Sequence, residues 1–246
     1  MSYIYGRNPV IEALRHGRQV QKIYIQHGNQ SGSIRQIYRR ARDLKIPVSN
    51  ADARKLRQIA GDGNHQGVVA LIAPVEVGDE HALLDALLQA SGPVTLVFLD
   101  RIQDPHNMGA IIRSAEVFGA SGVVFSTREN VPVTDTVVKA SAGAALNCPL
   151  YQTHNLAQLI DRIKAQQDLR FYGAALDGSE ALWDVDFSGD CAIIIGSEEK
   201  GIRPLLQKKC DHLFQIPQRG KTQSLNASVA AGIVLAERER QRRAEG

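Results

Sequence analysis

Short apolar runs alternate with longer amphipathic stretches along most of the 246-residue chain. A run such as Val94–Leu99 (VTLVFL) is apolar or uncharged at every position, which is typical of a strand buried on both faces of a parallel sheet. The stretches between such runs repeat apolar positions every three or four residues, which predicts helices. In the larger, C-terminal part the expected strands are Val94–Leu99, Val123–Ser126, Arg170–Ala175, Cys191–Ile195 and Leu213–Ile216, and the expected helices are Ala82–Ala90, Met108–Phe118, Asp135–Leu146, Leu156–Gln166 and Asn226–Arg243.

The beginning of the chain repeats this alternation on a smaller scale. Asn8 followed by Pro9 predicts a helix start, because asparagine caps helices and proline suits their first turn. That helix is expected to end near Gly17. Strands separated by helices indicate an α/β fold for this part as well. The remaining elements expected here are strands at Lys22–Gln26 and Gly67–Ala73, an extended piece at Ile46–Val48, and helices at Ser33–Leu44 and Asp52–Ile59.

The charge of the chain changes sign between its two parts. Residues 1–75 carry 12 Lys and Arg against 4 Asp and Glu, whereas residues 76–246 carry 17 against 22. The change falls at Pro74–Glu80 (PVEVGDE), which has no helical period and is expected to be a linker. We therefore expect a small α/β domain over 1–75, a linker over 76–84, and a doubly wound or related parallel α/β domain over 85–246.

The basic excess of the first domain favours a polyanionic partner such as RNA, although charged helix faces in solvent would give the same count. The helix expected at Ser33–Leu44 concentrates this charge. Its arginines are the leading candidates for contacts with RNA, namely Arg35, Arg39, Arg40 and Arg42.

Composition narrows the class of protein. Hydrophobic residues make up 43% and charged residues 22% of the chain, as in ordinary globular proteins. No apolar run approaches the roughly 20 residues of a membrane helix, and the N-terminus lacks the apolar core of a signal peptide. Cys148, Cys191 and Cys210 form no C-x-x-C pair, and the histidines form no cluster. A cytoplasmic protein with no metal, no disulfide framework and no membrane partner is therefore expected.

Three polar, glycine-containing segments follow expected strands, where open α/β sheets place their ligands. Asp100–Ala115 carries Asn107 near a helix start and Arg113 six residues later. Gly196–Gly201 (GSEEKG) follows a buried strand. Ile216–Ser228 leads into the last helix, and its basic residues beside Gly220 suit a nucleic-acid phosphate, since a helix N-terminus favours anions. Those basic residues are Arg219 and Lys221.

Each segment also has a purely structural interpretation. Asn107 would simply cap a helix, Arg113 would be a surface charge, and Ser224 or Asn226 would cap the last helix. The GSEEKG segment would be a turn bounded by glycines. None of the three segments decides the function by itself.

Several familiar motifs are absent or incomplete. The GSEEKG segment is not a P-loop, because Ile202 stands where that motif needs lysine, and no G-x-G-x-x-G follows a strand. Ser197 and Lys200 match the S-x-x-K of penicillin-binding enzymes, but no K-T-G follows. The hypothesis that the protein is an acyl-serine hydrolase is therefore supported by a four-residue match alone.

Taken together and in order, the three segments resemble the motifs of the SpoU (TrmH-type) RNA ribose 2′-O-methyltransferases of the SPOUT superfamily. Asp104–Ala115 (DPHNMGAIIRSA) resembles the first motif, and Ile194–Gly201 (IIGSEEKG) resembles the second. Ile216 and Pro217 with Ser224–Ile233 (SLNASVAAGI) resemble the third. The order and spacing over some 130 residues make this resemblance specific.

The resemblance extends to the front of the chain. Tyr5–Leu14 (YGRNPVIEAL) and His65–Val68 (HQGV) are similar to the substrate-binding domain of the branch that modifies guanosine in bacterial 23S rRNA. The implied fold is a small ribosomal-protein-like α/β substrate-binding domain followed by an α/β trefoil-knot (SPOUT) methyltransferase domain. The implied protein is a homodimer with its methyl-donor sites near the subunit interface.

The implied reaction transfers a methyl group from S-adenosylmethionine to a ribose 2′-hydroxyl of RNA, most specifically a guanosine of 23S rRNA or of a large-subunit precursor. The alternatives are a tRNA ribose methyltransferase and a non-catalytic RNA-binding protein of the same fold. Because the sulfonium donor is already activated, the protein must position the hydroxyl, help to remove its proton and bury the donor.

The resemblance also assigns roles to individual residues. Arg113 is the principal catalytic residue. Because a guanidinium almost never loses its proton, we expect it to bind phosphate and to stabilise negative charge developing on the 2′-oxygen. Any side chain at Gly196 is expected to intrude where backbone must approach a ligand closely. The residues expected to orient Arg113 and the ribose are Asn107, Glu198, Ser224 and Asn226, and those expected to hold the methyl donor are Gly196, Ile216, Leu225 and Ala175.

Overall fold

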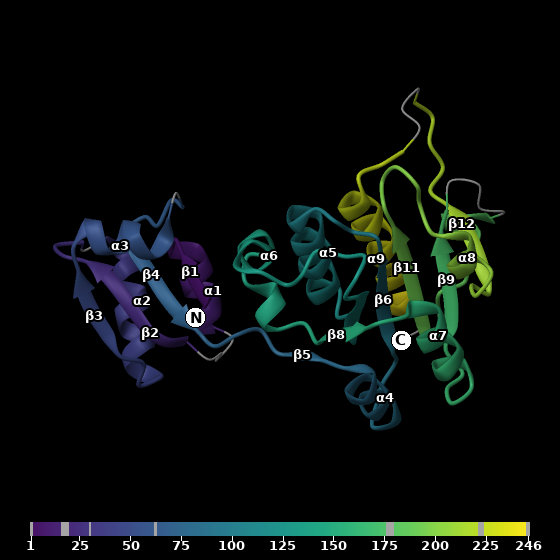
Figure 1. Cartoon of the computed structure of the whole chain (residues 1–246), viewed down its shortest axis with the longest axis horizontal. Helices are drawn as coiled ribbons and strands as arrows, with labels where there is room; N and C mark the ends of the chain where they lie inside the picture. The colour runs from purple at the N-terminus through teal and green to yellow at the C-terminus, as the bar shows by residue number, and fades with distance from the viewer. Residues whose placement is uncertain are drawn as a thin grey trace. The chain divides into compact units, whose positions relative to one another are not determined.

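The chain forms two compact α/β units in a computed structural model (Figure 1). The expected α/β class is thereby confirmed. One unit consists of Met1–Glu76 with Val133–Asn147, and the other of Val77–Pro132 with Cys148–Gly246. The structure describes residues 2–15, 20–29, 31–61, 63–175, 180–220 and 224–244.

The first unit is built on a four-stranded sheet with the order β1-β4-β2-β3. Strand β4 pairs antiparallel with both β1 and β2, whereas β2 and β3 are parallel. Alternate residues of β2, Ile23 and Ile25, are fully buried, as are Ile34 and Ile37 on one side of α2. The elements are β1 (Ser2–Tyr5), α1 (Arg7–Arg15), β2 (Val20–Gln26), α2 (Gly32–Asp43), β3 (Val48–Ala51), α3 (Ala53–Ala60), β4 (Val68–Ile72), α6 (Asp135–Ala140) and a 3-10 turn at Ala144–Leu146.

Two sequence predictions in this unit are wrong in detail. Helix α1 begins at Arg7, so Asn8 lies inside the helix and does not cap it. The helix expected at Asp135–Leu146 stops at Ala140, because the backbone at Ala142 and Gly143 is left-handed with φ of 52° and 90°. An α-helix cannot continue through two such residues.

Helix α6 packs against β1 within this unit. Lys139 Nζ donates a hydrogen bond of 3.1 Å to the Tyr5 hydroxyl, and the same ammonium lies 4.5 Å from the centre of the Tyr5 ring. A cation over an aromatic face is attracted by the ring quadrupole. The segment Val133–Asn147, which is distant in sequence, is thus joined to the small sheet.

The second unit is built on an eight-stranded sheet with the order β10-β12-β9-β11-β6-β7-β8-β5. Every strand pair in it is parallel, so the carboxyl ends of the strands meet at one edge. Its elements are β5 (Val77–Gly78), α4 (Glu80–Leu88), β6 (Thr95–Asp100), α5 (Pro105–Val117), β7 (Gly122–Ser126), β8 (Leu150–Thr153), α7 (Leu156–Lys164), β9 (Arg170–Ala174), β10 (Glu180–Ala181), a 3-10 turn at Leu182–Asp184, β11 (Cys191–Gly196), α8 (Pro204–Gln207), β12 (His212–Gln215) and α9 (Ala227–Ala244).

Helices cover both faces of this sheet. Phe98 of β6 and Phe171 of β9 belong to a core that includes apolar residues of α4, α7 and α8. Helices α5 and α9 pack against each other and against β7 and β11, on the face that receives the alternate strand residues Val97 and Leu99. All four of these strand residues are fully buried, which explains the unbroken apolar runs in the sequence.

Four short elements of this unit were not expected from the sequence. Strands β5 and β10 have two residues each, and α8 has four. Strand β8 has four residues, of which the first and last, Leu150 and Thr153, are buried. Such short elements carry too few periodic positions to be distinguished from loops.

The three cysteines are free thiols, and Cys148 and Cys191 are buried. Burial raises the pKa of the Cys210 thiol to about 12, so this thiol stays protonated at neutral pH. No helix in the described part of the chain is long and apolar enough to cross a membrane.

A buried carboxylate fastens the edge of the sheet where the strands end. Asp100, at the end of β6, has no exposed surface. It accepts hydrogen bonds of 2.8 Å from both the backbone N and Nε of Arg203. Arg203 follows the loop after β11, so this pair ties that loop to β6.

We expect Asp100→Ala to lower the free energy of unfolding by about 1–3 kcal/mol, because it removes a buried acceptor and leaves the backbone N and Nε of Arg203 without their partner. The matched control is Asp161→Ala, whose carboxylate pairs with Lys209 while 56% exposed. An exposed pair contributes about 0–1 kcal/mol. Urea unfolding of both variants measures the difference, and equal losses would contradict the assigned role of Asp100.

Candidate active site

Three loops meet at the carboxyl edge of the second sheet. One joins β6 to α5, one follows β11, and one joins β12 to α9. Strands β6 and β11 are neighbours, with Gly196 in register with Asp100. Helices α5 and α9 pack against each other, which brings their first turns together. The loops therefore converge because of the parallel sheet and the paired helices.

The Glu198 carboxylate joins side chains from all three loops. Its Oε1 accepts a hydrogen bond of 2.8 Å from Asn107 Nδ2 and another from Asn226 Nδ2. The backbone N of Ala227 donates to the same oxygen at 3.3 Å. Asn226 Nδ2 also lies 2.8 Å from Asn107 Oδ1, to which it donates. Residues 119 positions apart are thus part of one network.

Helix capping does not account for Asn107. Asp104 caps α5, accepting a hydrogen bond of 2.9 Å from the backbone N of His106. Asn226 has both roles, because its Oδ1 accepts from the backbone N of Ser228 at 2.9 Å while its Nδ2 faces Glu198. The amide of Asn107 is therefore available for the network alone.

A cavity beside this network contains all four residues expected to hold the methyl donor, namely Ala175, Gly196, Ile216 and Leu225. Apolar groups dominate its walls, with the carboxyl ends of β9, β11 and β12 around it. Ser224 and Glu198 also line it. Its volume is about 70 Å³.

A second, more polar cleft adjoins the network on another side. Its walls include Arg101, Asp104, Asn107 and Lys200, and its volume is about 330 Å³. Glu198 lines both this cleft and the cavity. Its carboxylate therefore lies at the boundary between a mainly apolar space and a polar one.

The loop after β11 is a closed turn. The backbone N of Gly201 donates to the Ser197 carbonyl at 2.8 Å, and the backbone N of Lys200 donates to Ser197 Oγ at 3.3 Å. The serine hydroxyl thus bonds to backbone, and no hydrogen bond joins it to the Lys200 ammonium in the described structure. This arrangement gives no support to a serine–lysine hydrolase.

Arg113 does not join the network. It lies on α5, is exposed, and has no hydrogen-bond or ion-pair partner among the described residues. It also lines neither the cavity nor the cleft. The structure therefore brings Asn107, Glu198 and Asn226 together and leaves Arg113 apart from them.

Of the two basic residues expected near the last helix, Arg219 is exposed. Lys221 lies outside the described residues. In the part of the chain that is described, no group of three or more His, Cys, Asp or Glu side chains is placed to hold a metal ion.

The sequence interpretation missed the residues that hold the loop after β11. Arg101 Nη2 donates a 3.1 Å hydrogen bond to the Gly201 carbonyl, and Arg203 bonds to buried Asp100. Arg101 has a left-handed backbone, with φ of 62°, which is uncommon for a residue with a side chain. The signal available in the sequence was the pair of opposite charges at Asp100 and Arg101, which comes at the end of the buried strand β6.

Family comparisons agree with this geometry. Residues 94–236 match the SpoU rRNA Methylase family, and residues 3–78 match the RNA 2′-O ribose methyltransferase substrate-binding family. A TrmH family tRNA/rRNA methyltransferase of Staphylococcus haemolyticus is 39% identical over 243 residues, covering 99% of this chain and 97% of the relative. The chain belongs to the SpoU/TrmH family of RNA methyltransferases.

Solved structures of this family have the same fold. The SpoU methyltransferase AviRb from Streptomyces viridochromogenes is 25% identical with a TM-score of 0.80, covering 99% of this chain and 90% of AviRb. The AdoMet-bound rRNA methyltransferase of Sinorhizobium meliloti is 25% identical with a TM-score of 0.76, covering 97% and 87%. The two-part fold expected from the resemblance, with a SPOUT methyltransferase domain, is confirmed.

We expect Gly196→Ala to destabilise the SpoU-type second unit. A Cβ at this position would lie 2.2 Å from the Gly201 carbonyl carbon and 2.4 Å from the Ile202 nitrogen, so the loop carrying Glu198 would have to move. Overpacking of this kind costs about 1–3 kcal/mol. The control is Gly92→Ala, where a Cβ meets no atom within 4 Å. Chemical unfolding compares the two, and an unchanged stability for Gly196→Ala would contradict this packing argument.

Proposed function

We propose that this protein transfers the methyl group of S-adenosylmethionine to the ribose 2′-hydroxyl of a guanosine in 23S rRNA or in a large-subunit precursor. The observation that carries the proposal is the junction of Asn107, Glu198 and Asn226 beside the cavity of the expected donor residues. Binding RNA alone would not require three distant loops to converge there. The similarity to an AdoMet-bound rRNA methyltransferase supports the same activity.

The chemistry of the cavity fits the methyl donor. Ile216, Leu225 and Ala175 offer apolar surface for an adenine ring, and Gly196 presents backbone at the end of a strand. Parallel strand ends supply backbone donors and acceptors to a ligand at this edge. When bound, S-adenosylmethionine supplies an electrophilic methyl group on its sulfonium. Glu198, which lines the cavity, would add a carboxylate to the donor site.

The network residues would orient the acceptor ribose. All the hydrogen bonds described for Glu198 end on Oε1, so Oε2 is available to accept one from a ribose hydroxyl. Asn107 and Asn226 hold the carboxylate by their amide donors, which fixes its direction. Alignment of hydroxyl and methyl group is a large part of catalysis for a reaction with an activated donor. Ser224, on the cavity wall, adds a hydroxyl to the same site.

Arg113 would act on the RNA from the outer side of α5. Its guanidinium has no partner among the described residues. A phosphate of the bound RNA would pair with this guanidinium. The positive charge of Arg113 would then lie near the reacting 2′-oxygen and stabilise the developing oxyanion. Arg113 is in this account a residue that completes the site when RNA binds.

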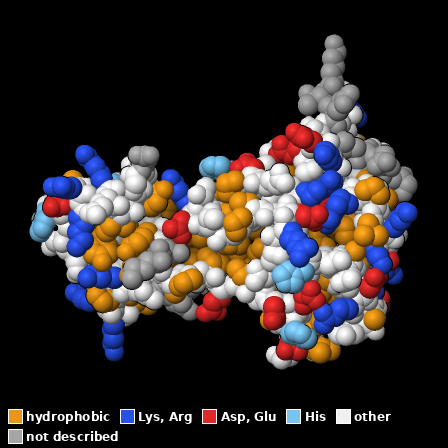
Figure 2. Space-filling model, in the orientation of Figure 1, with side chains coloured by type: hydrophobic (Ala, Val, Ile, Leu, Met, Phe, Trp, Pro, Cys, Tyr) orange, Lys and Arg blue, Asp and Glu red, His pale blue; other side chains and the backbone are white. Residues whose placement is uncertain are grey.

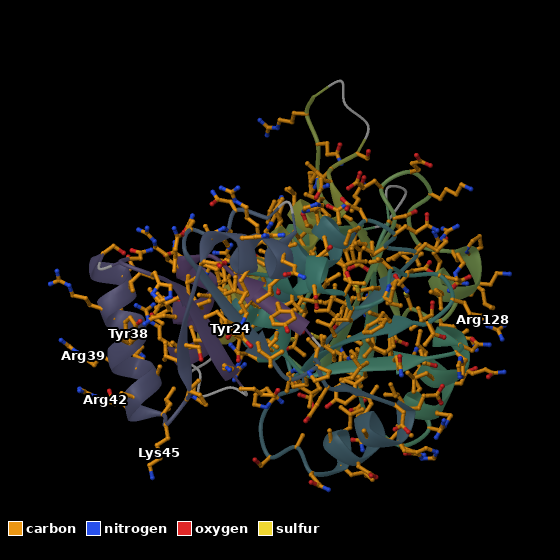
Figure 3. The ribbon with its side chains drawn as sticks, turned by 60° about the vertical axis from the view of Figure 1, so that its left-hand side comes forward. Tyr24, Tyr38, Arg39, Arg42, Lys45 and Arg128 are labelled. Atoms are coloured by element: carbon orange, nitrogen blue, oxygen red, sulfur yellow. The ribbon has the colours of Figure 1, made fainter. Side chains whose placement is uncertain are left out.

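The first unit offers a surface for the RNA backbone, which supports 1–75 as the substrate-binding domain. Arg35, Arg39 and Arg42 are exposed at intervals of one or two turns of α2, whereas Arg40 is partly buried. Figure 3 shows Arg39, Arg42, Lys45 and Tyr38 extending from α2 and its end, and Figure 2 shows Lys and Arg side chains around this unit. Neutralising phosphates with such side chains releases counterions and favours binding.

We also propose that the protein works as a homodimer in the cytoplasm. Val117 of α5 and Val229 of α9 are 65% and 49% exposed, and both helices border the site. Burial of these side chains against a second subunit would place the interface beside Arg113 and the donor cavity. The three free thiols suit a reducing compartment.

The test is methyl transfer from labelled S-adenosylmethionine to transcripts of 23S rRNA and of tRNA, with the product nucleotide identified by nuclease digestion and mass spectrometry. We expect a 2′-O-methylguanosine in 23S rRNA. Methylation of tRNA and not of 23S rRNA would show that tRNA is the substrate. No transfer to any RNA by folded protein, in the presence of retained RNA binding, would favour a non-catalytic RNA-binding protein.

In the same assay, Arg113→Ala should lower the rate of methyl transfer by about 100-fold or more, as expected when a charge that stabilises an oxyanion is lost. Its affinity for S-adenosylmethionine, measured by calorimetry, should change less than about threefold, because Arg113 does not line the cavity. Arg128→Ala, which removes another exposed arginine of the second unit, serves as the control with ordinary turnover. Ordinary turnover by Arg113→Ala would remove that residue from the mechanism.

A further inference from the structure

A polar cleft in the first unit lies apart from the residues assigned to methyl transfer. Four chain segments form it: the start of α1, the end of β2, the end of α3 and the turn before β4. Its volume is about 560 Å³, within the range of about 300–1,000 Å³ for pockets that take small ligands. The polar side chains that matter most here are those of Arg7, Asn29, Arg57, Asn64, His65 and Gln66.

The two sequence segments that resemble a substrate-binding domain converge at this cleft. Gln66 Oε1 accepts a 3.2 Å hydrogen bond from the backbone N of Arg7, and the Gln66 carbonyl accepts one of 3.3 Å from Arg7 Nε. These contacts join positions 59 residues apart. The terminal nitrogens of Arg7 have no partner among the described residues, so they are available to a ligand.

The turn that forms one wall holds an unfavourable backbone conformation. Gln66 has a left-handed φ of 48°, and Gly67 follows with a φ of 80°. A left-handed glutamine costs energy that a glycine would avoid, and strain of this kind concentrates at ligand sites. A Cβ at Gly67 would lie 2.4 Å from Asn29 Nδ2, so the turn and the Asn29 amide are closely fitted.

The hydrogen-bonding groups of the cleft are oriented for a ligand with both donors and acceptors. The backbone N of Gly67 donates to His65 Nδ1 at 3.0 Å, so in neutral His65 the hydrogen is on Nε2, which is a donor. Asn64 is exposed, and its amide provides one acceptor and two donors. Arg57, exposed in the last turn of α3, adds a second guanidinium.

We propose that this cleft binds an unpaired nucleotide of the RNA substrate, with the base edge at Asn64 and His65 and the adjoining phosphates at Arg7 and Arg57. Amide and imidazole groups match the edges of a base, and guanidinium groups match phosphate. Proteins that read RNA sequence do so mainly at unpaired nucleotides. The proposal rests on RNA being the substrate, and it assigns to the cleft a selectivity that the exposed arginines of α2 do not provide.

The experiment compares two RNA duplexes of equal length, one fully paired and one with a short unpaired bulge, binding to the full-length protein in a fluorescence anisotropy assay. The wild type should bind the bulged duplex about tenfold more tightly. The double variant Arg57→Ala, Asn64→Ala should retain a preference of less than about twofold. Its control, Arg54→Ala, Gln58→Ala, removes an exposed arginine and an exposed amide of α3 outside the cleft and should keep the wild-type preference.

Three results would overturn the proposal: no preference in the wild type, an unchanged preference in the cleft variant, or equal weakening of both duplexes by the cleft variant alone. The last result would make the cleft a contact for phosphates of any RNA. A cross-link from 4-thiouridine in the bulge to residues 63–67 of the wild type should accompany the preference, and it does not depend on any variant folding. A cross-link only to α2 would contradict the assignment.

The methyl-transfer assay separates this proposal from the proposed function. If the protein prefers the bulged RNA but transfers no methyl group, the cleft is a nucleotide site and the proposed enzymatic activity is wrong. If the protein methylates RNA but shows no preference for unpaired nucleotides, the proposed activity is correct and the assignment of the cleft is wrong.

Discussion

One carboxylate oxygen, Glu198 Oε1, is the point on which the site depends. It accepts hydrogen bonds from Asn107, Asn226 and the backbone of Ala227, and these come from the first turns of the two helices that cover one face of the sheet. Hydrogen bonds to charged groups are worth about 1.5–3 kcal/mol each, but Glu198 is exposed. The network therefore needs loops that are held in place by other contacts.

Those other contacts are partly or fully buried. The Asp100 carboxylate at the end of β6 holds Arg203, and Arg101 bonds to the Gly201 carbonyl. Between them, Gly196 lies so close to Gly201 that no side chain fits. A parallel sheet brings the strand ends together, and these contacts then fix the loop that carries Glu198. The exposed site is thus positioned by contacts between the edge of the sheet and the loop that follows β11.

The sequence was most informative where a pattern repeated over several residues. Runs such as Val94–Leu99 predicted the central strands, because burial on both faces requires an apolar side chain at nearly every position. It was least informative at β5, β10 and α8, which are stabilised by neighbours distant in sequence. The left-handed backbone of Ala142 left no signal, because alanine is an ordinary helix former. Gly143, which is also left-handed, was the signal available for the end of α6.

The candidate site, too, could be predicted from the sequence only in part. Resemblance to the SpoU motifs identified Asn107, Glu198 and Asn226, and the structure brings these three together. It could not show which helix positions cap and which bond across loops, since that depends on contacts between α5 and α9. Nor could the sequence show that Arg113 extends away from the network, because the direction of a side chain depends on the packing of its helix.

The most direct test of the central claim is a double-mutant cycle on methyl transfer with Asn107→Ala and Glu198→Gln. If the two side chains act as one hydrogen-bonded unit, each single variant should lose activity and the double variant should lose about tenfold less than the product of the two losses. Thermal unfolding of all three variants confirms that each is folded. Losses that simply multiply would show that Asn107 and Glu198 act independently, and that the network joining the three loops does not organise the site.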